Sequence, residues 1–352
     1  MSLRPEDDLR QSSSGRQALV PAQPSRSPMK ILHDYRHFPS SQRTSVTIGN
    51  FDGLHLGHRS ILVDLVRSAA ASGTVSVVMT FSPHPLQVLH PGKAPKLIIP
   101  IEDKIARIES LGVDYLLLVK FDEELSRLSG EGFIREILVG SLRIQHVFVG
   151  HNFVFGHKRS GNVALLEALG REFDYTVHVI PPVAVRGSRV SSTGIRDLIR
   201  SGRISQANRL LGHYYTLQGR VVPGEGLGRT VLFPTLNLEA QNEILPGNGV
   251  YATLALFEGK SHTGVTNVGT RPTVAGTGGV SVETHLLEHT PESPPSTLEL
   301  KFLHRLRNEH KFPSVDELKK QIAKDIQRSR RFFGLFRRLR QNFQQSGLDN
   351  IG

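Results

Sequence analysis

The 352-residue chain contains no cysteine, no apolar run long enough to cross a membrane and no hydrophobic segment near its amino end. The absence of cysteine excludes a disulfide scaffold, a thiolate zinc site and a cysteine nucleophile. A membrane span needs roughly 18 apolar residues and a secretory signal needs a hydrophobic centre, so the sequence predicts neither. We therefore expect a cytoplasmic protein without a membrane partner. At roughly 150 residues per domain, the length predicts about two domains.

Positive charge is concentrated at the two ends of the chain. The formal net charge is +11, from 43 Lys and Arg against 32 Asp and Glu. Solvated basic ends are the simplest interpretation. In the alternative, the arginines and phenylalanines of residues 328–340 form an amphipathic helix that contacts RNA, an acidic partner or a membrane surface. We do not expect nucleic acid as a partner.

An α/β pattern occupies residues 45–203. Residues 1–44, rich in Ser, Gln, Pro and Arg, are expected to be a disordered lead-in. The predicted strands cover residues 46–48, 75–81, 115–119, 146–149 and 176–180. Helices are predicted after Gly57 and over residues 104–111, 132–142 and 163–173. Such alternation implies right-handed crossovers and a parallel, Rossmann-like sheet, an architecture typical of nucleotide-binding domains.

The pattern changes after two short predicted helices at residues 194–200 and 205–211. Apolar runs separated by Gly- and Pro-rich turns then predict a small antiparallel β-barrel within residues 213–340. These runs cover residues 214–222, 250–258, 262–268, 280–287 and 297–303. A C-terminal helix should begin at Ser314, which forms a capping box with Glu317, and end near Arg340. Residues 341–352 would be a tail.

Glycines and histidines cluster where the first predicted strand meets the first helix. Residues 49–58 read Gly-Asn-Phe-Asp-Gly-Leu-His-Leu-Gly-His. A helix amino end beyond the carboxyl edge of a parallel sheet suits phosphate, and glycine lets the backbone approach an anion. His55 and His58 can face one phosphate group and offset charge that develops as pyrophosphate leaves. A surface or capping histidine and a zinc pair are the alternatives, although no third ligand with matching spacing is visible.

A second anion site is predicted before the helix at residues 194–200. Ser192 and Thr193 place hydroxyls at its amino end, and Arg189 and Arg196 flank them. Hydroxyls and arginines at a helix start can bind phosphate oxygens. An ordinary N-cap with solvated arginines is the alternative.

Two polar residues follow other predicted strands at the same sheet edge. His84 lies in the sequence Pro-His-Pro and either contacts a ligand or belongs only to a rigid turn. Asn152 follows the strand at residues 146–149 and suits the edge of a base. The two phenylalanines after it are more typical of a core than of a stacking platform.

Oxygen ligands and a carboxylate occur in the β module. Thr235 and Asn237 share one face of an extended chain, and Mg²⁺ typically takes one or two protein oxygens together with substrate phosphates. The glycine-rich residues 224–228 could fold over those phosphates. In the strand predicted over residues 280–287, Glu283 is a candidate general base for a hydroxyl that attacks a terminal phosphate. A solvated strand face is the alternative.

In their order along residues 45–330, these motifs resemble the bacterial bifunctional riboflavin kinase/FAD synthetase family. They are the ten residues from Gly49, Thr-Phe-Ser-Pro-His-Pro, Ser-Ser-Thr-x-Ile-Arg and Pro-Thr-x-Asn. The resemblance implies an N-terminal nucleotidylyltransferase domain and a C-terminal riboflavin kinase barrel. The barrel would transfer the γ-phosphate of ATP to riboflavin, and the other domain would join FMN to AMP, releasing pyrophosphate. Both reactions would use Mg²⁺.

The resemblance also implies residue roles. In the nucleotidylyltransferase domain, residues that bind or shape the ATP phosphate site would be His55, His58, Gly49, Phe51, Asp52, Gly57, Arg189, Ser192, Thr193 and Arg196. His84 and Asn152 would line the nucleotide or flavin. In the kinase barrel, Thr235 and Asn237 would hold Mg²⁺–ATP, and Glu283 would be the catalytic base.

The kinase motif departs from the family pattern at two points. Leu232 and Leu236 replace a glycine and an alanine beside the metal ligands, and residues 289–295 replace an Asp-Leu-Tyr-Gly stretch. Added bulk near a phosphate could lower affinity or redirect the loop. An enzyme that only adenylylates FMN, with an impaired or regulatory barrel, is the alternative. The sequence leaves the oligomeric state open.

Overall fold

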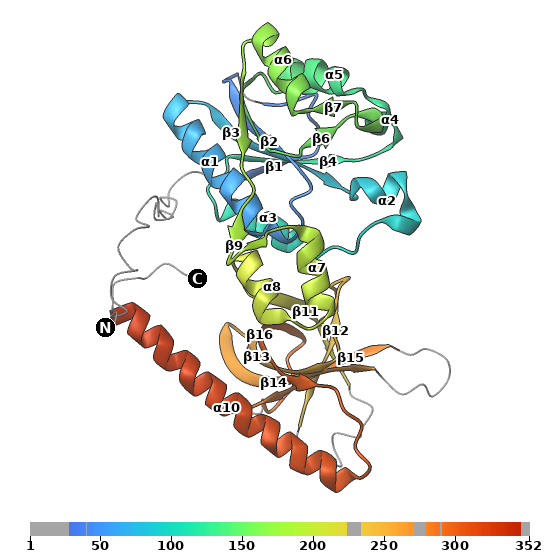
Figure 1. Ribbon diagram of the computed structural model, residues 1–352, viewed down its shortest axis with the longest axis vertical. Helices are drawn as coiled ribbons and strands as arrows, with labels where there is room; N and C mark the ends of the chain where they lie inside the picture. Colours follow the sequence, from blue (N-terminus) through green and yellow to red (C-terminus); the bar gives the residue numbers. More distant parts are fainter. Residues whose placement is uncertain (1–27, 40, 224–233, 271–278, 289–290, 346–352) are drawn as a thin grey trace, which may run out of the picture.

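An α/β domain and a β-barrel are stacked end to end, with two short helices between them and a long helix beside the barrel (Figure 1). The structure is a computed structural model that describes residues 28–39, 41–223, 234–270, 279–288 and 291–345. This architecture confirms the fold class expected from the sequence.

Six parallel strands form the sheet of the first domain in the order β1-β4-β3-β2-β5-β8. They are β1 (Lys30–Leu32), β2 (Thr44–Ile48), β3 (Val75–Ser82), β4 (Tyr115–Lys120), β5 (Ile144–Gly150) and β8 (Thr176–Ile180). The central strands β2 and β3 are rich in β-branched residues and almost entirely buried. Such strands are typical of a sheet that is covered on both faces.

Helices cover this sheet as the alternating pattern predicts. They are α1 (Leu56–Ser72), α2 (Pro85–Leu89), α3 (Ile101–Glu109), α4 (Glu123–Arg127), α5 (Gly130–Gly132) with the π-helix η3 (Phe133–Ser141), and α6 (Val163–Phe173). Short elements between them are η1 (Asp52–Leu54), η2 (Pro91–Lys93), η4 (His157–Arg159), β6 (Val154–Phe155), β7 (Gly161–Asn162), β9 (Ala184–Val185) and β10 (Ser188–Arg189). The helix predicted over residues 132–142 is therefore mainly a π-helix.

The expectation of disorder over residues 1–44 does not hold for the described part of that segment. Strand β1 pairs in parallel with β4, with Lys30 opposite Tyr115, and forms the edge of the sheet. Arg43 donates hydrogen bonds to Asp174 and to the carbonyl of Ile144. A strand of three residues carries too little periodicity to be recognised. Residues 1–27 and residue 40 lie outside the described residues.

The second domain is a closed antiparallel barrel with the strand order β11-β12-β15-β14-β13-β16. Its strands are β11 (Tyr215–Val222), β12 (Leu236–Ala240), β13 (Gly249–Phe257), β14 (Lys260–Thr270), β15 (Val280–Leu286) and β16 (Thr297–Asn308). Closure removes the unpaired edges that an open sheet would present.

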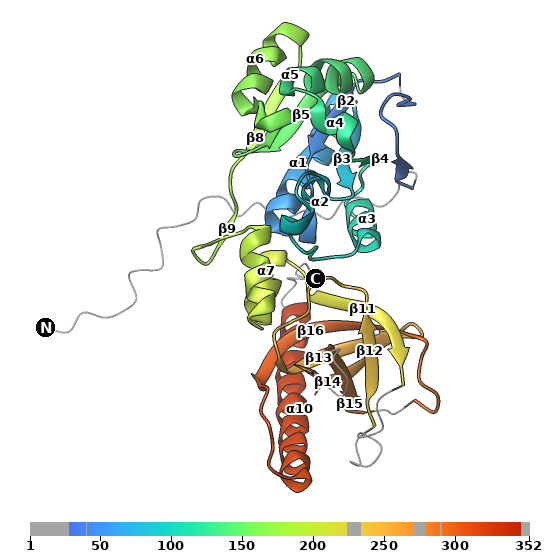
Figure 2. The same ribbon diagram turned by 90° about the vertical axis from the view of Figure 1, so that its right-hand side faces the viewer.

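Helix α10 (Val315–Gln345) covers one outer face of the barrel and runs along it (Figure 2). The amide of Glu317 donates to the side chain of Ser314, as expected for an N-cap. Ile326 and Phe333 of this helix pack on Val250 and other apolar residues of the barrel wall. Phe332, Phe333 and Phe336 of this helix therefore serve packing. The helix extends to residue 345, so residues 341–345 belong to the helix and not to the predicted tail.

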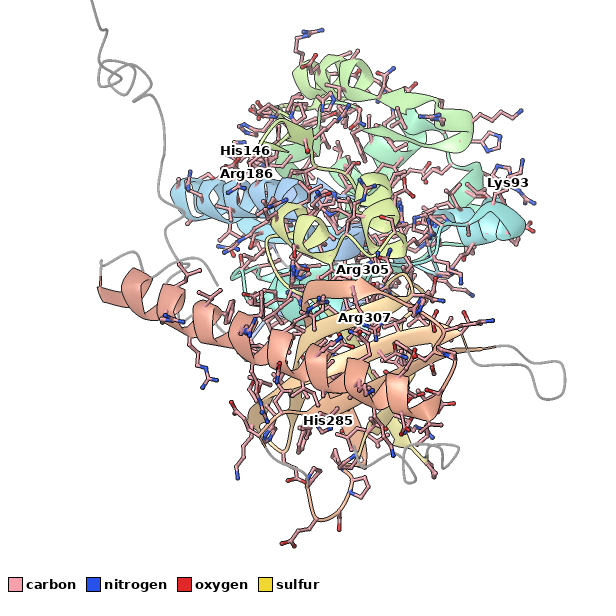
Figure 3. The ribbon with its side chains drawn as sticks, turned by 60° about the horizontal axis from the view of Figure 1, so that its bottom comes forward. Lys93, His146, Arg186, His285, Arg305 and Arg307 are labelled. Carbon is pink, nitrogen blue, oxygen red and sulfur yellow. The ribbon has the colours of Figure 1, made fainter. Side chains whose placement is uncertain are left out.

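Helices α7 (Ser192–Arg200) and α8 (Ile204–Leu211) join the domains through a continuous apolar core. Asn208 of α8 bonds to the carbonyl of Phe302 and to the amide of Tyr215. Gly212 ends α8 at φ 77°, and a Cβ there would come within 2.4 Å of Leu56 in α1. Figure 3 shows Arg305 on the barrel surface near these helices, where it donates to the carbonyl of Ser201.

Candidate active sites

The glycine- and histidine-rich turn lies at the carboxyl end of the central strand β2. The chain passes from β2 to β3 and β4 on one side and then returns to β5 on the other, so the strand order reverses at β2. Ligands in open α/β sheets bind at such a switch point. Phe51 has φ 47° and leads into η1, after which His55 caps α1. The predicted motif therefore occupies the expected position for a nucleotide site.

The rings of His55 and His58 are stacked, with centroids 3.6 Å apart and planes 15° from parallel. Burial lowers the pKa of His55 to about 4 and holds the pKa of His58 well below its usual range. Both imidazoles are therefore neutral near pH 7. His55 Nδ1 accepts the amide of His58 at 3.2 Å, so its own proton lies on Nε2. The structure thus brings together two neutral rings, each with one N–H group to donate.

Asp52 and Arg196 form a buried ion pair across the same turn. Arg196 Nη2 lies 2.6 Å from Asp52 Oδ2, and both side chains are buried. Asp52 also accepts the amide of Ile98, while Arg196 Nε donates to the carbonyl of Lys96. These bonds go to protein groups and tie the turn, the segment at residues 96–98 and α7 together. Direct phosphate contacts by Asp52 and Arg196 stay a prediction.

The amino end of α7 approaches the turn from the other side. Ser191 caps the helix by accepting the amide of Gly194. Ser192 donates its hydroxyl to the carbonyl of Asp52 at 3.1 Å, and Thr193 is exposed. The amino end of α7 therefore lies against η1, which leads into the amino end of α1. Phosphate binding by Ser192 and Thr193 stays a prediction.

Further predicted residues belong to nearby turns. Arg189 Nη2 lies 3.2 Å from His151 Nε2, which joins β10 to the turn after β5 where Asn152 is exposed. His84 caps α2, because its Nδ1 accepts the amide of Leu86 at 3.2 Å. Burial lowers the pKa of His84, although nearby Asp52 raises it. His84 therefore has a structural role as the cap of α2, and its ligand contact stays a prediction.

Sequence reasoning missed Lys104 on α3. Its side chain is buried, and its Nζ donates to the carbonyl of Asn50 at 2.8 Å. Its charge helps to lower the pKa of His58, and its hydrogen bond to Asn50 places it at the same turn as the histidine pair. Lys104 stands four residues before the apolar Ile108, and this spacing puts both side chains on one face of a helix. That spacing was the available signal, because both residues are buried in the structure.

The barrel brings the predicted kinase residues into one row. Asn237 of β12 lies opposite Glu283 of β15, and Glu283 lies opposite Asn267 of β14. Directly opposed residues of antiparallel strands share a face. Val282 and Leu286 point into the barrel core, and because side chains alternate along a strand, Glu283 lies on the outer face. The row adds Asn267 as a neighbour that sequence reasoning did not assign to the site.

A pocket of about 190 Å³ lies beside this row at Thr235. It is lined by Pro234, Thr235, Leu236, Thr284, Leu286, Pro291, Glu292 and Pro294. Leu236 is buried in the barrel core, so its bulk is directed away from the face that carries Asn237. Leu232, the glycine-rich residues 224–228 and residues 289–290 lie outside the described residues.

An α/β nucleotide-binding domain followed by a closed barrel with a carboxylate–amide row defines a two-site nucleotide-dependent transferase. Family models match residues 37–194 as FAD synthetase and residues 211–333 as riboflavin kinase. The chain belongs to the bifunctional riboflavin kinase/FMN adenylyltransferase family, which confirms the resemblance.

Curated relatives with this bifunctional name align with the chain over nearly their whole length. The relative from Escherichia coli (strain K12) is 39% identical over 310 residues, which cover 87% of this chain and 99% of the relative. The relative from Bacillus subtilis (strain 168) is 36% identical and covers 88% and 98%. A solved structure described as a macrolide-efflux protein from Streptococcus pneumoniae is 26% identical, has a TM-score of 0.78, and covers 86% of this chain and 99% of that one. In the described ranges of the present chain, no helix is long and apolar enough to span a membrane.

Proposed function

We propose that this chain phosphorylates riboflavin to FMN at the barrel and adenylylates FMN to FAD at the turn after β2. The single observation that carries the proposal is the pairing of two different sites on one chain. One holds stacked neutral imidazoles at a sheet switch point, and the other holds Asn237 opposite Glu283. Neither arrangement by itself accounts for both reactions.

In the adenylyl transfer, a phosphate oxygen of FMN attacks the α-phosphorus of ATP. The bond between that phosphorus and the oxygen bridging to the β-phosphate breaks, and pyrophosphate leaves with the electron pair. His55 and His58 donate N–H groups to oxygens that gain charge in this step. The Asp52–Arg196 pair holds the turn that positions both rings, and Arg189, Ser192 and Thr193 bind further phosphate oxygens. His84 and Asn152 line the nucleotide or flavin.

In the kinase reaction, Glu283 accepts the proton of the ribityl hydroxyl as its oxygen attacks the γ-phosphorus of ATP, and ADP leaves. Thr235 and Asn237 fit Mg²⁺ because both offer hard oxygen donors from alternate positions of one chain segment. When bound, Mg²⁺ would neutralise charge on the ATP phosphates. We place both reactions in the cytoplasm.

The test supplies the purified full-length protein with ATP and Mg²⁺ and either riboflavin or FMN, and separates the flavins by chromatography. FMN followed by FAD is expected from riboflavin, and FAD from FMN. FAD from FMN, with no product from riboflavin, would establish the adenylyltransferase-only alternative. No product from either flavin would refute the proposal.

A further inference from the structure

Lys104 carries a positive charge inside the adenylylation site. Its side chain is 5% exposed, and its Nζ donates to the carbonyl of Asn50, in the turn between β2 and η1. That carbonyl also accepts from Thr80 Oγ1 at 3.4 Å. A buried ammonium normally has a carboxylate partner, because removal from water costs several kcal/mol per ion.

The acidic groups around Lys104 are bonded elsewhere. Burial lowers the pKa of Lys104, and the charge of Asp52 opposes this only in part. Asp52 is itself paired with Arg196. Asp103, the residue before Lys104, accepts from Gln218. Within the described part of the chain, no carboxylate is bonded to Lys104 Nζ. The Asp52–Arg196 pair is electrically balanced, so the site has one buried cation in excess.

An anion that enters this site would supply the missing charge. The two imidazoles next to Lys104 are neutral and cannot do so. One of the three ammonium protons is used on Asn50, which leaves two for oxygen atoms. Both substrates of the proposed reaction carry phosphate, and the group that fits a buried point charge beside N–H donors is a phosphate oxygen.

We infer that Lys104 binds a substrate phosphate during adenylyl transfer and stabilises the charge that develops there. This inference rests on the proposed function. The phosphate belongs either to ATP or to FMN, and the kinetics distinguish the two sources. A role limited to holding the Asn50 carbonyl is the competing explanation, because an uncharged donor would fulfil it.

The experiment compares Lys104→Met, Lys104→Gln and Lys104→Arg in the full chain. Lys93→Met is the matched control, since Lys93 is an exposed lysine of the same domain (Figure 3). We expect Lys104→Met and Lys104→Gln each to lower kcat/KM for FMN adenylylation by about 100-fold or more. Lys104→Arg should retain more activity than Lys104→Gln, and Lys93→Met should match the wild type. A larger rise in KM for ATP assigns the ATP phosphate, and a larger rise in KM for FMN assigns the FMN phosphate.

Measurements of thermal stability and of riboflavin phosphorylation distinguish a loss of phosphate binding from a loss of folding. Without substrate, Lys104→Met should melt at or above the wild-type temperature, because it removes an unpaired buried cation. If the kinetics assign the ATP phosphate, inorganic pyrophosphate should raise the melting temperature of the wild type more than that of Lys104→Met. Riboflavin phosphorylation should continue in every variant. Adenylylation by Lys104→Gln at the wild-type rate, with unchanged KM values, would overturn the inference. A wild-type protein that forms no FAD from FMN would instead refute the proposed function.

Discussion

Replacing His55 by asparagine is expected to make the fold less sensitive to acid. The Oδ1 atom of asparagine can accept the amide of His58 in place of the ring nitrogen, so the cap of α1 is retained. What the substitution removes is a buried group whose pKa falls from 6.5 to about 4 on folding, because burial disfavours the charged ring.

The sign of the effect follows from proton binding. Between about pH 6.5 and pH 4 the unfolded chain protonates this imidazole and the folded chain does not. The free energy of unfolding therefore decreases as the pH falls through this window, and the contribution is constant above it. At about 1.4 kcal/mol for each pKa unit, His55 accounts for a loss of about 3 kcal/mol.

Urea unfolding followed by circular dichroism, repeated from about pH 7 to about pH 4, measures this loss. The wild-type profile should fall more steeply than that of His55→Asn, by about 3 kcal/mol over the window. His90→Asn, at an exposed ring of the same domain, should retain the wild-type slope. Parallel profiles for the wild type and His55→Asn, or an NMR titration of folded His55 with its midpoint near pH 6.5, would refute the reasoning.

Three further outcomes are expected. His58→Ala should lower FAD formation from FMN by about 100- to 1000-fold and spare riboflavin phosphorylation, as measured by chromatography of both flavins. Glu283→Gln should do the reverse, lowering FMN formation by about 100-fold or more; equal loss of both activities in either variant would contradict separate sites. Arg196→Met should destabilise the fold by about 3–5 kcal/mol by leaving Asp52 buried without its cation. The double variant with Asp52→Leu should recover much of that stability in thermal melts, and a double variant as unstable as Arg196→Met would contradict the ion-pair argument.

Much of the architecture could be predicted because its signals are local. Runs such as residues 75–81 are rich in β-branched residues and buried on both sides, and the run predicted as a strand over residues 280–287 forms one. Strands β1 and β12 were missed. The first has three residues, and the second follows a glycine- and proline-rich segment, so neither presents a sustained pattern.

The residues of each site could be predicted from local motifs, but the long-range contacts between them could not. His55 and His58 are close in sequence, and a helix start brings them together. Asp52 and Arg196 are separated by 144 positions, so their pairing depends on how α7 packs against the turn after β2. The row of Asn237, Glu283 and Asn267 likewise depends on barrel register. No local pattern encodes such long-range partners.

The apolar core that the two domains share at α7 and α8 limits how FMN can pass from one site to the other. Strand β11 begins at this junction with Tyr215 and reaches Asn237 only at Val222, seven residues further on, which is roughly 20 Å of strand. Asp103–Gln218 and Leu97–Glu243 hydrogen bonds fasten the two domains beside the junction. A hinge motion that carried FMN from the barrel to the turn after β2 would have to disrupt this core. FMN is therefore expected to be released into bulk solvent and recaptured, so a trap for free FMN should intercept it between the two reactions.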